Sequence, residues 1–410
     1  FRDGFSTGHG FLREPNDIRS YSALACIAIQ SNQNDQHGGQ SVPNFDYSMA
    51  PGVRKTFRKL FRDNLAKALE VFGEDDNNEV DARALTERVE QETGKWACLA
   101  GGNGYDEAMA KALSETLDEK TVAKCMKFAR KYADKETRKT TYQAMEALVH
   151  NLNTMHSRAG AQIPFSSLNY GTDTSPEGRL VMEQLLLATE AGLGNGETPI
   201  FPIHIFKVKE GVNYNEGDPN YDLKQLALEC ATKRMYPDVI FYENIVKITG
   251  SFKAPMGCRS FLQGWIDPKT GKDVEDGRMN LGVVTVNIPR IALESHGDKD
   301  RFWKIFDERM TVAHQALQFR IMRCKQATPV NAPTLFRFGA FGRLGANDSV
   351  DQLFRNERAT VSLGYIGLYE ATSVFYGKDW MRDHDWDPEG KEFALSIVKR
   401  MNELCKDWST

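Results

Sequence analysis

This chain of 410 residues lacks paired cysteines. Its seven cysteines lie at positions 26, 98, 125, 230, 258, 324 and 405, and none belongs to a Cys-x-x-Cys pair. Structural disulfides and zinc sites use cysteines at short spacings, so the pattern indicates reduced thiols in a reducing compartment. The histidines offer no ligand spacing either, because His150 and His156 are six residues apart and do not share a helix face. No metal site is expected.

The sequence also has no apolar run long enough to span a membrane and no basic-then-apolar signal segment at its start. Its net charge of −4 gives no general attraction to a nucleic-acid polymer. With 41% hydrophobic and 26% charged residues, it has the composition of a globular protein with a large core. We therefore expect a cytoplasmic protein with no membrane or nucleic-acid-polymer partner.

A phosphate-binding P-loop is missing as well. Residues 192–196 read GLGNG but lack the Lys-Ser/Thr of that motif, so they are expected to end a helix. A second phosphate candidate is the loop at 331–345, which contains Arg343. Arg158 and Arg179 could each contact phosphate or pair with a nearby carboxylate, and the sequence leaves both alternatives open.

Hydrophobic periodicity divides the chain into a mainly helical part, 1–160, and a strand-helix part, 161–410. Expected helices are 53–70, 107–117, 119–132, 136–155, 177–191, 223–235, 301–325 and 389–405. Expected strands are 162–168, 200–208, 239–242, 281–288 and 334–338. Alternating strands and helices indicate an α/β fold whose largely parallel sheet or barrel has its helices outside.

Cys258 is the residue whose setting most suggests chemistry. Pro255 and Gly257 bracket it into a turn, and no second cysteine is near. A single thiol on a tight loop suits one-electron or nucleophilic chemistry. The alternative is a buried free cysteine that acts as a small hydrophobic residue.

Several longer segments favour the chemical interpretation. In chain order they are 31–41 (SNQNDQHGGQS), 155–174 (MHSRAGAQIPFSSLNYGTDT), 176–179 (PEGR), 192–202 (GLGNGETPIFP), 256–260 (MGCRS), 277–282 (GRMNLG) and 287–290 (NIPR). These segments resemble the anaerobic, glycyl-radical (class III) ribonucleoside-triphosphate reductases, in the family's order and over most of the chain.

The resemblance implies a ten-stranded α/β barrel with outer helices and a central finger loop near 251–262, with Cys258 at its tip. It implies an oxidoreductase that reduces ribonucleoside triphosphates to 2′-deoxyribonucleoside triphosphates. A thiyl radical at Cys258 would abstract the 3′ hydrogen, and formate would be the reductant. Met256 and Asn280 match active-site residues of the family; ordinary packing for Met256 and a turn role for Asn280 remain alternatives.

Asn169, Ser166, Thr334 and Arg158 are the candidate substrate-binding residues. The resemblance further implies a homodimer whose interface and effector site, for ATP, dATP, dGTP or dTTP, involve residues 1–160. A separate iron-sulfur, S-adenosylmethionine-dependent activase would install the glycyl radical.

The chain departs from the family's full pattern at three places. An N-terminal nucleotide-sensing cone and a C-terminal domain with zinc-binding cysteines and the glycyl-radical motif are both expected to be absent. The family's second active-site cysteine is not assigned either, because Cys26 falls in a helical run, 22–30. We therefore expect a catalytic-barrel core that does not turn over alone. Two other interpretations stay open: a different glycyl-radical enzyme, of the acyl or diol lyase type, or a non-catalytic nucleotide-binding barrel.

Overall fold

The computed structural model describes residues 4–73, 81–158, 160–256, 260–261, 265–355, 358–382 and 385–409. The chain forms two compact units. The first unit consists of Phe1–Phe261 with Ala332–Leu344, and the second of Leu262–Asn331 with Gly345–Thr410. Among the described residues, no helix is both long enough and apolar enough to cross a membrane.

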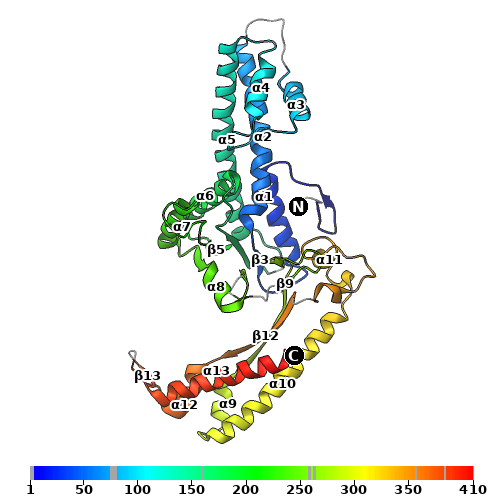
Figure 1. The fold of residues 1–410 in the computed structure, drawn as a ribbon. Helices are drawn as coiled ribbons and strands as arrows, with labels where there is room; N and C mark the ends of the chain where they lie inside the picture. Colours follow the sequence, from blue (N-terminus) through cyan, green and yellow to red (C-terminus); the bar gives the residue numbers. More distant parts are fainter. Residues whose placement is uncertain are drawn as a thin grey trace. The chain divides into compact units, whose positions relative to one another are not determined.

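The first unit contains a short hairpin, one parallel sheet, a second hairpin and several helices (Figure 1). Its strands are β1 (Phe5–Ser6), β2 (Phe11–Leu12), β3 (Gln40–Val42), β4 (Ser166–Tyr170), β5 (Ile203–Val208), β6 (Asp238–Phe241), β7 (Pro255–Met256) and β8 (Ser260–Phe261). Its helices are α1 (Ile18–Asn32), α2 (Phe45–Phe72), α3 (Ala82–Thr93), α4 (Tyr105–Leu113), α5 (Glu119–Thr154), α6 (Pro176–Ala191), α7 (Tyr221–Arg234), α8 (Tyr242–Thr249) and α11 (Pro333–Phe336).

The sheet of the first unit has the order β3-β4-β5-β6, and all its neighbours run parallel. Every residue of β4 and β5 is buried, as expected for strands covered on both faces. Side chains alternate between the two faces along a strand. Leu168, Tyr170 and Phe206 point to the face that packs on the helices, where they join one hydrophobic core.

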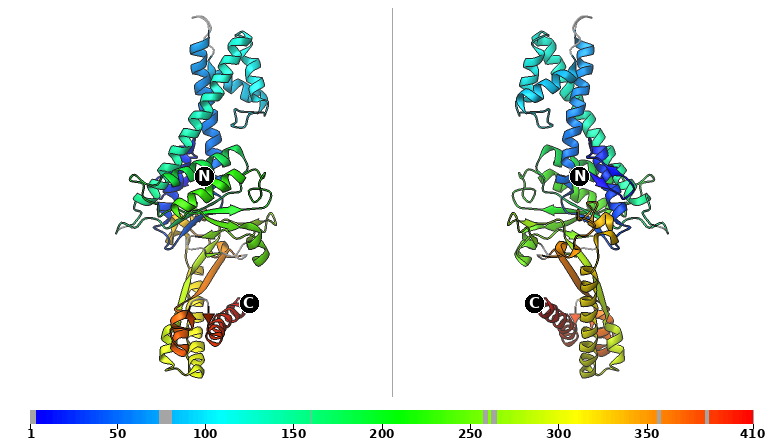
Figure 2. Two further views of the ribbon diagram at one scale, coloured as in Figure 1. Left: turned by 90° about the vertical axis from the view of Figure 1, so that its left-hand side faces the viewer. Right: turned by 90° about the vertical axis from the view of Figure 1, so that its right-hand side faces the viewer.

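Helices α2 and α5 form a long antiparallel pair, with α3 and α4 packed beside its far end (Figures 1 and 2). On α2 the buried apolar residues recur every three or four positions, which is the spacing of one helix face: Val53, Phe57, Phe61, Leu65 and Ala68. The facing side of α5 carries small buried residues, including Ala129 and Ala133. Small side chains let the two helices approach closely, and the pair has its own core with α3 and α4.

The second unit is built on one pair of long parallel strands, β11 (Met279–Asn287) and β12 (Ala359–Ile366). Around it are the helices α9 (Ile288–Glu294), α10 (Lys299–Lys325), α12 (Leu368–Tyr376) and α13 (Pro388–Trp408). The shorter elements are β9 (Trp265–Ile266), β10 (Asp273–Val274), η1 (Pro329–Asn331), η2 (Val350–Leu353), β13 (Met381–Arg382) and β14 (Asp385–Trp386). Phe302 and Phe306 of α10 pack with Phe393 of α13 in the core of this unit.

The predicted α/β class is confirmed, and most predicted elements occur within a few residues of their expected bounds. The two helices expected at 119–132 and 136–155 are a single helix, α5, because nothing between them breaks the helical pattern. The strand expected at 334–338 is wrong. Pro333 begins the short helix α11 there, and the Asp35 carboxylate accepts hydrogen bonds from the amides of Thr334 and Leu335.

Candidate functional site

Two short paired strands, β7 and β8, flank the segment that carries Cys258. Antiparallel pairing sets Pro255 opposite Phe261 and Met256 opposite Ser260. Cys258 itself lies outside the described residues. Pro255 is buried and Met256 is half-buried. The backbone on both sides of the cysteine is therefore fixed in the first unit.

Asn169 lies beside this segment. Its Nδ2 donates to the carbonyl of Pro255 at 3.2 Å and to Oγ of Ser41 at 2.9 Å. The Ser41 hydroxyl donates to the same carbonyl at 3.3 Å. Asn169 is fully buried, and its Oδ1 has no hydrogen-bond partner among the described residues. The predicted site residue Asn169 and the predicted loop segment are thus brought together.

Ser166 lies three residues before Asn169 on β4, so the two side chains point to opposite faces of the sheet. Its Oγ is buried without a hydrogen-bond partner in the part of the chain described. Ser167 shares the face of Asn169 and donates to the carbonyl of Gln40 at 3.4 Å. Strict alternation along β4 could have singled out Ser167, but the strand was expected at 162–168, which does not include Asn169.

Arg158 contacts the segment that follows α1. Its guanidinium donates to the carbonyl of Gln36 and, at 3.4 Å, to Oε1 of Gln162. Arg179, which the sequence left open, forms an ion pair with Asp222 at 2.7 Å, so for that residue carboxylate pairing is the observed alternative. The glycine-rich run behaves as expected, since Gly192 ends α6 with a positive φ of 82°.

Thr334 lies in the first turn of α11, and its side chain is buried. Its amide donates to Oδ2 of Asp35 at 2.5 Å, and the amide of Leu335 donates to the same oxygen at 3.1 Å. Arg343, further along the same loop, donates to the carbonyl of Gly4 at 2.6 Å. The amides that were candidates for binding phosphate therefore donate to a carboxylate of the chain itself, that of Asp35.

Asn280 belongs to the second unit, where it lies at an irregularity in the pairing of β11 with β12. Its Nδ2 donates to Oγ of Ser362 at 2.9 Å, and its Oδ1 accepts from the amide of Gly282 at 2.8 Å. The second of these bonds is the turn role that the sequence analysis kept as an alternative for this residue.

Lys207 is a polar residue of the sheet that the sequence analysis missed. It is 2% exposed, and its Nζ donates to Oδ1 of Asn44 at 2.6 Å and to the carbonyl of Pro43 at 3.0 Å. The same Nζ lies 5.6 Å from the ring centroid of Phe252, which in turn stacks on Tyr242. A lysine inside the apolar run 200–208 was the signal that could have identified it.

The thiol of Cys26 lies on α1 and is buried, which raises its pKa to about 12. A thiol with this pKa stays protonated near neutral pH and is a poor nucleophile. The described part of the chain contains no group of three or more His, Cys, Asp or Glu side chains that could hold a metal ion.

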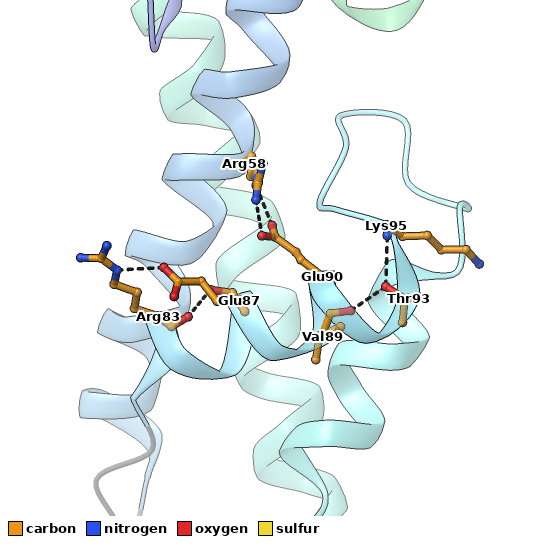
Figure 3. A network of polar contacts seen from close by, with 8 residues as sticks. Arg58, Arg83, Glu87, Val89, Glu90, Thr93 and Lys95 are labelled. Atoms are coloured by element: carbon orange, nitrogen blue, oxygen red, sulfur yellow. Dashed lines mark hydrogen bonds and ion pairs between the residues drawn. The ribbon is translucent and has the colours of Figure 1, made fainter.

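A separate pocket of about 260 Å³ lies between α2 and α3. Its cationic lining comes from α2 and consists of Lys55, Arg58, Lys59 and Arg62. Figure 3 shows Arg58 directed from α2 toward Glu90 on α3, with its Nε 2.6 Å from Oε1. The hydrogen bond to Glu90 raises the pKa of the Arg58 guanidinium above its usual range, so Arg58 is positively charged at all physiological pH values.

Comparison with known proteins shows the family to which this sequence belongs. The profile of the family described as "Anaerobic ribonucleoside-triphosphate reductase" matches residues 1–410. The chain is 46% identical over 279 residues to the enzyme of that name from Escherichia coli K12, a match that covers 68% of this chain and 38% of the relative. It is 35% identical over 415 residues to the enzyme of that name from phage T4, covering 99% of this chain and 56% of the relative.

A solved structure of similar fold is the anaerobic ribonucleotide reductase of Thermotoga maritima in complex with dATP and CTP. The sequence identity is 15% and the TM-score 0.51, and the match covers 98% of this chain and 54% of that one. In both sequence and fold, the chain corresponds to between about two fifths and three fifths of these relatives. This chain belongs to the anaerobic ribonucleoside-triphosphate reductase family.

Proposed function

We propose that the chain is the catalytic core of an enzyme that reduces ribonucleoside triphosphates to 2′-deoxyribonucleoside triphosphates without oxygen. The observation that carries this proposal is the family match over all 410 residues, which includes the Met-Gly-Cys-Arg-Ser loop. The geometry supports it, because the backbone before Cys258 is bonded to a buried side chain of the parallel sheet. Reactive groups of α/β enzymes commonly lie where loops meet such sheets.

Cys258 would act as a transient thiyl radical that abstracts the 3′ hydrogen of the ribose and later returns it. With the 3′ position activated, the 2′-hydroxyl leaves as water after it takes up a proton. Formate supplies the two electrons and becomes carbon dioxide, so one ribonucleotide, one formate and one proton give one deoxyribonucleotide, one water and one carbon dioxide. A radical stored on a glycine elsewhere in the protein, installed by a separate activase, would start each cycle.

Six other residues are proposed to take part in the reaction or in substrate binding. Met256 precedes the loop, and Asn280 would bind ribose or formate through an amide that now serves Ser362 and Gly282. Asn169 is the best supported substrate-binding residue, because its buried Oδ1 would accept a hydrogen bond from a ribose hydroxyl. Ser166 and Thr334 are weaker candidates, since one points to the helix face and the other has its amide bonded to Asp35. Arg158 would offer its guanidinium to phosphate.

For the fold we propose a ten-stranded barrel with the segment 251–262 as its finger loop. It is supported by two sets of parallel strands, one in each unit, and by β4 and β5 being buried on both faces. Residues 1–160 would form the helical part and residues 161–410 the strand-helix part. A zinc domain and the glycyl radical would belong to segments beyond this sequence.

Residues 1–160 would also carry the homodimer and effector surface, in a cytoplasmic enzyme. The Thermotoga maritima enzyme was solved with dATP and CTP, which supports nucleotide effectors here. The α2 pocket is the candidate for their phosphates, because its four cations outnumber the two carboxylates that share the lining, Glu87 and Glu90. Replacing Lys59, on that lining, with Glu should weaken dATP binding in equilibrium dialysis at least about tenfold, whereas unchanged binding would place the effector elsewhere.

The central test is Cys258→Ser in the native protein, assayed without oxygen with the activase, formate and the four ribonucleoside triphosphates. Deoxyribonucleotide formation should disappear, and binding of the triphosphates should remain within about twofold, since sulfur and oxygen differ little in size. Formation of deoxyribonucleotides by the variant would refute the role of Cys258. Nucleotide binding without turnover in the wild type would favour a non-catalytic barrel.

A further inference from the structure

The carbonyl of Pro255 is held by two side chains from different strands of the sheet. Ser41 comes from β3 and Asn169 from β4, and these strands pair so that Ser41 is opposite Ser167. Each hydrogen on Nδ2 of Asn169 and on the hydroxyl of Ser41 has its own acceptor. One Nδ2 hydrogen of Asn169 goes to Ser41 and the other to Pro255, while the Ser41 hydroxyl hydrogen also goes to Pro255. A carbonyl oxygen has two lone pairs, so it can accept both bonds.

The orientation of the Asn169 amide follows from the same contacts. A carbonyl oxygen only accepts hydrogen bonds, so the amide nitrogen rather than Oδ1 must face Pro255. The residue is fully buried, and water does not replace these bonds. Removing one of the two donors leaves one lone pair of the buried carbonyl unsatisfied, which is costlier than losing the same bond at the surface.

A second anchor lies three residues earlier. Phe252 is 3% exposed, and its ring stacks on Tyr242 with centroids 4.3 Å apart and planes at 7°. The Nζ of Lys207 lies 5.6 Å from the Phe252 centroid. Between this aromatic anchor and the Pro255 carbonyl, the chain has only Lys253 and Ala254, both of them buried. The backbone from Phe252 to Pro255 is thus attached at both ends.

We propose that Asn169 and Ser41 are positioning residues that hold the backbone at Pro255, three residues before Cys258, and thereby support the reactivity of that cysteine. The proposal rests on the proposed function only in taking Cys258 as the reactive residue. Hydrogen abstraction depends steeply on the distance between the sulfur and the hydrogen, and a displacement of about 1 Å can cost roughly a hundredfold in rate. A loop of this kind therefore needs rigid support from the scaffold that carries it.

The direct test is local mobility, measured in the native protein by hydrogen exchange and by iodoacetamide labelling of Cys258, both resolved by peptide mass spectrometry. Asn169→Leu, which keeps the branched shape and removes the donor, should speed exchange in peptide 252–261 about tenfold, and Ser41→Ala about threefold. Labelling of Cys258 should accelerate in parallel. Ser41→Thr keeps the hydroxyl and should restore wild-type exchange.

The matched control is Ser22→Ala, because the buried Ser22 hydroxyl also donates to a backbone carbonyl, that of Ala144, at 2.8 Å. This variant should leave exchange in peptide 252–261 unchanged. If Asn169→Leu and Ser41→Ala also leave it unchanged, or raise exchange evenly throughout the chain, the positioning role is wrong.

Turnover gives an independent readout in the activated enzyme. Ser41→Ala should lower kcat about tenfold and change KM less than about twofold, because Ser41 is proposed to hold the backbone at Pro255 and not to bind the substrate. A rise in KM with an unchanged kcat would overturn the proposal. If the wild type forms no deoxyribonucleotide but the exchange results hold, the proposed function fails while the anchoring of the loop stands.

Discussion

In the first unit the central strands β4 and β5 have no exposed residue, whereas in the second unit β11 and β12 leave several side chains open to solvent. Val283 is 49% exposed and Ile366 is 54% exposed. Both sets of strands run parallel, and parallel strands are normally covered on both faces. Within its own unit the first sheet is covered on both faces, whereas β11 and β12 are covered less completely by the rest of theirs.

The same difference applies to carboxylates that accept hydrogen bonds from backbone amides. After β4, one oxygen of the fully buried Asp46 accepts hydrogen bonds from the amides of Gly171, Thr172 and Asp173, each at 3.0 Å. In the second unit the comparable carboxylate is that of Asp298, which is exposed and accepts from the first amides of α10. The same kind of substitution should therefore lower the free energy of unfolding more in the first unit than in the second.

The largest effect is expected from Asp46→Ala, which would leave the three amides after β4 buried without an acceptor. We expect a loss of about 4 kcal/mol in the free energy of unfolding. The matched variant Asp298→Ala should cost about 1 kcal/mol, since water can reach the amides that it exposes. Urea unfolding of both variants measures the difference. Equal losses would mean that burial does not distinguish the two carboxylates.

A matched pair of valines tests the cover of the strands themselves. Val208 on β5 is 1% exposed, and Val283 on β11 is 49% exposed. Val208→Ala should cost about 2 to 3 kcal/mol, because it removes buried apolar surface and leaves a cavity. Val283→Ala should cost about 0.5 kcal/mol or less. If Val283→Ala costs as much as Val208→Ala, the outer face of β11 is covered in solution by something that this structure does not contain.

The first unit should also respond to acid through a histidine in its core. His204 is fully buried between Tyr170 and Thr189, with Nδ1 3.2 Å from the Tyr170 hydroxyl and Nε2 3.3 Å from Oγ1 of Thr189. Thr189 donates its own hydrogen to the carbonyl of Leu185, so Nε2 carries the proton and Nδ1 accepts from Tyr170. Burial lowers the pKa of His204 to about 3.

The folded-state pKa of His204 lies below its ordinary value near 6.5. Above pH 6.5 the ring is therefore neutral in both the folded and the unfolded state, and its burial costs no stability through protonation. As the pH falls below 6.5, the unfolded state binds a proton that the folded state does not bind. Stability should then fall by about 1.4 kcal/mol per pH unit, or about 2 kcal/mol at pH 5. His204→Gln should lose this component. An unchanged slope between pH 6.5 and 5 in urea unfolding would contradict the assignment.

The sequence predicted well those features that depend on local pattern. The helix α2 follows from an apolar stripe at Val53, Phe57, Phe61 and Leu65, and α6 ends at Gly192 as the glycine run indicated. The prediction of secondary structure failed where a residue distant in the chain determines the local fold. The short helix α11 depends on Asp35, which lies almost 300 residues earlier in the chain and binds its first amides. No local pattern around Thr334 contains that information.

The candidate site shows the same division. The loop sequence around Cys258 and the family match identify the cysteine, but only the fold shows that Asn169 and Ser41 meet at the carbonyl of Pro255. Ser166 was chosen by motif, whereas the alternation of β4 directs it to the face opposite Asn169. Lys207 was missed because a lysine in an apolar strand has meaning only once its neighbours Asn44 and Phe252 are known.

A small effect on stability is expected at Asn280, a half-buried asparagine of the second unit. Asn280→Ala removes the bonds to Ser362 and Gly282 and should cost about 1 kcal/mol, because water can replace part of what is lost. Ser362→Ala removes only one of these bonds and should cost about half as much. If Asn280 also binds substrate, its loss should lower deoxyribonucleotide formation far more than Ser362→Ala does. Equal losses of activity in the two variants would mean that Asn280 only holds β11 against β12.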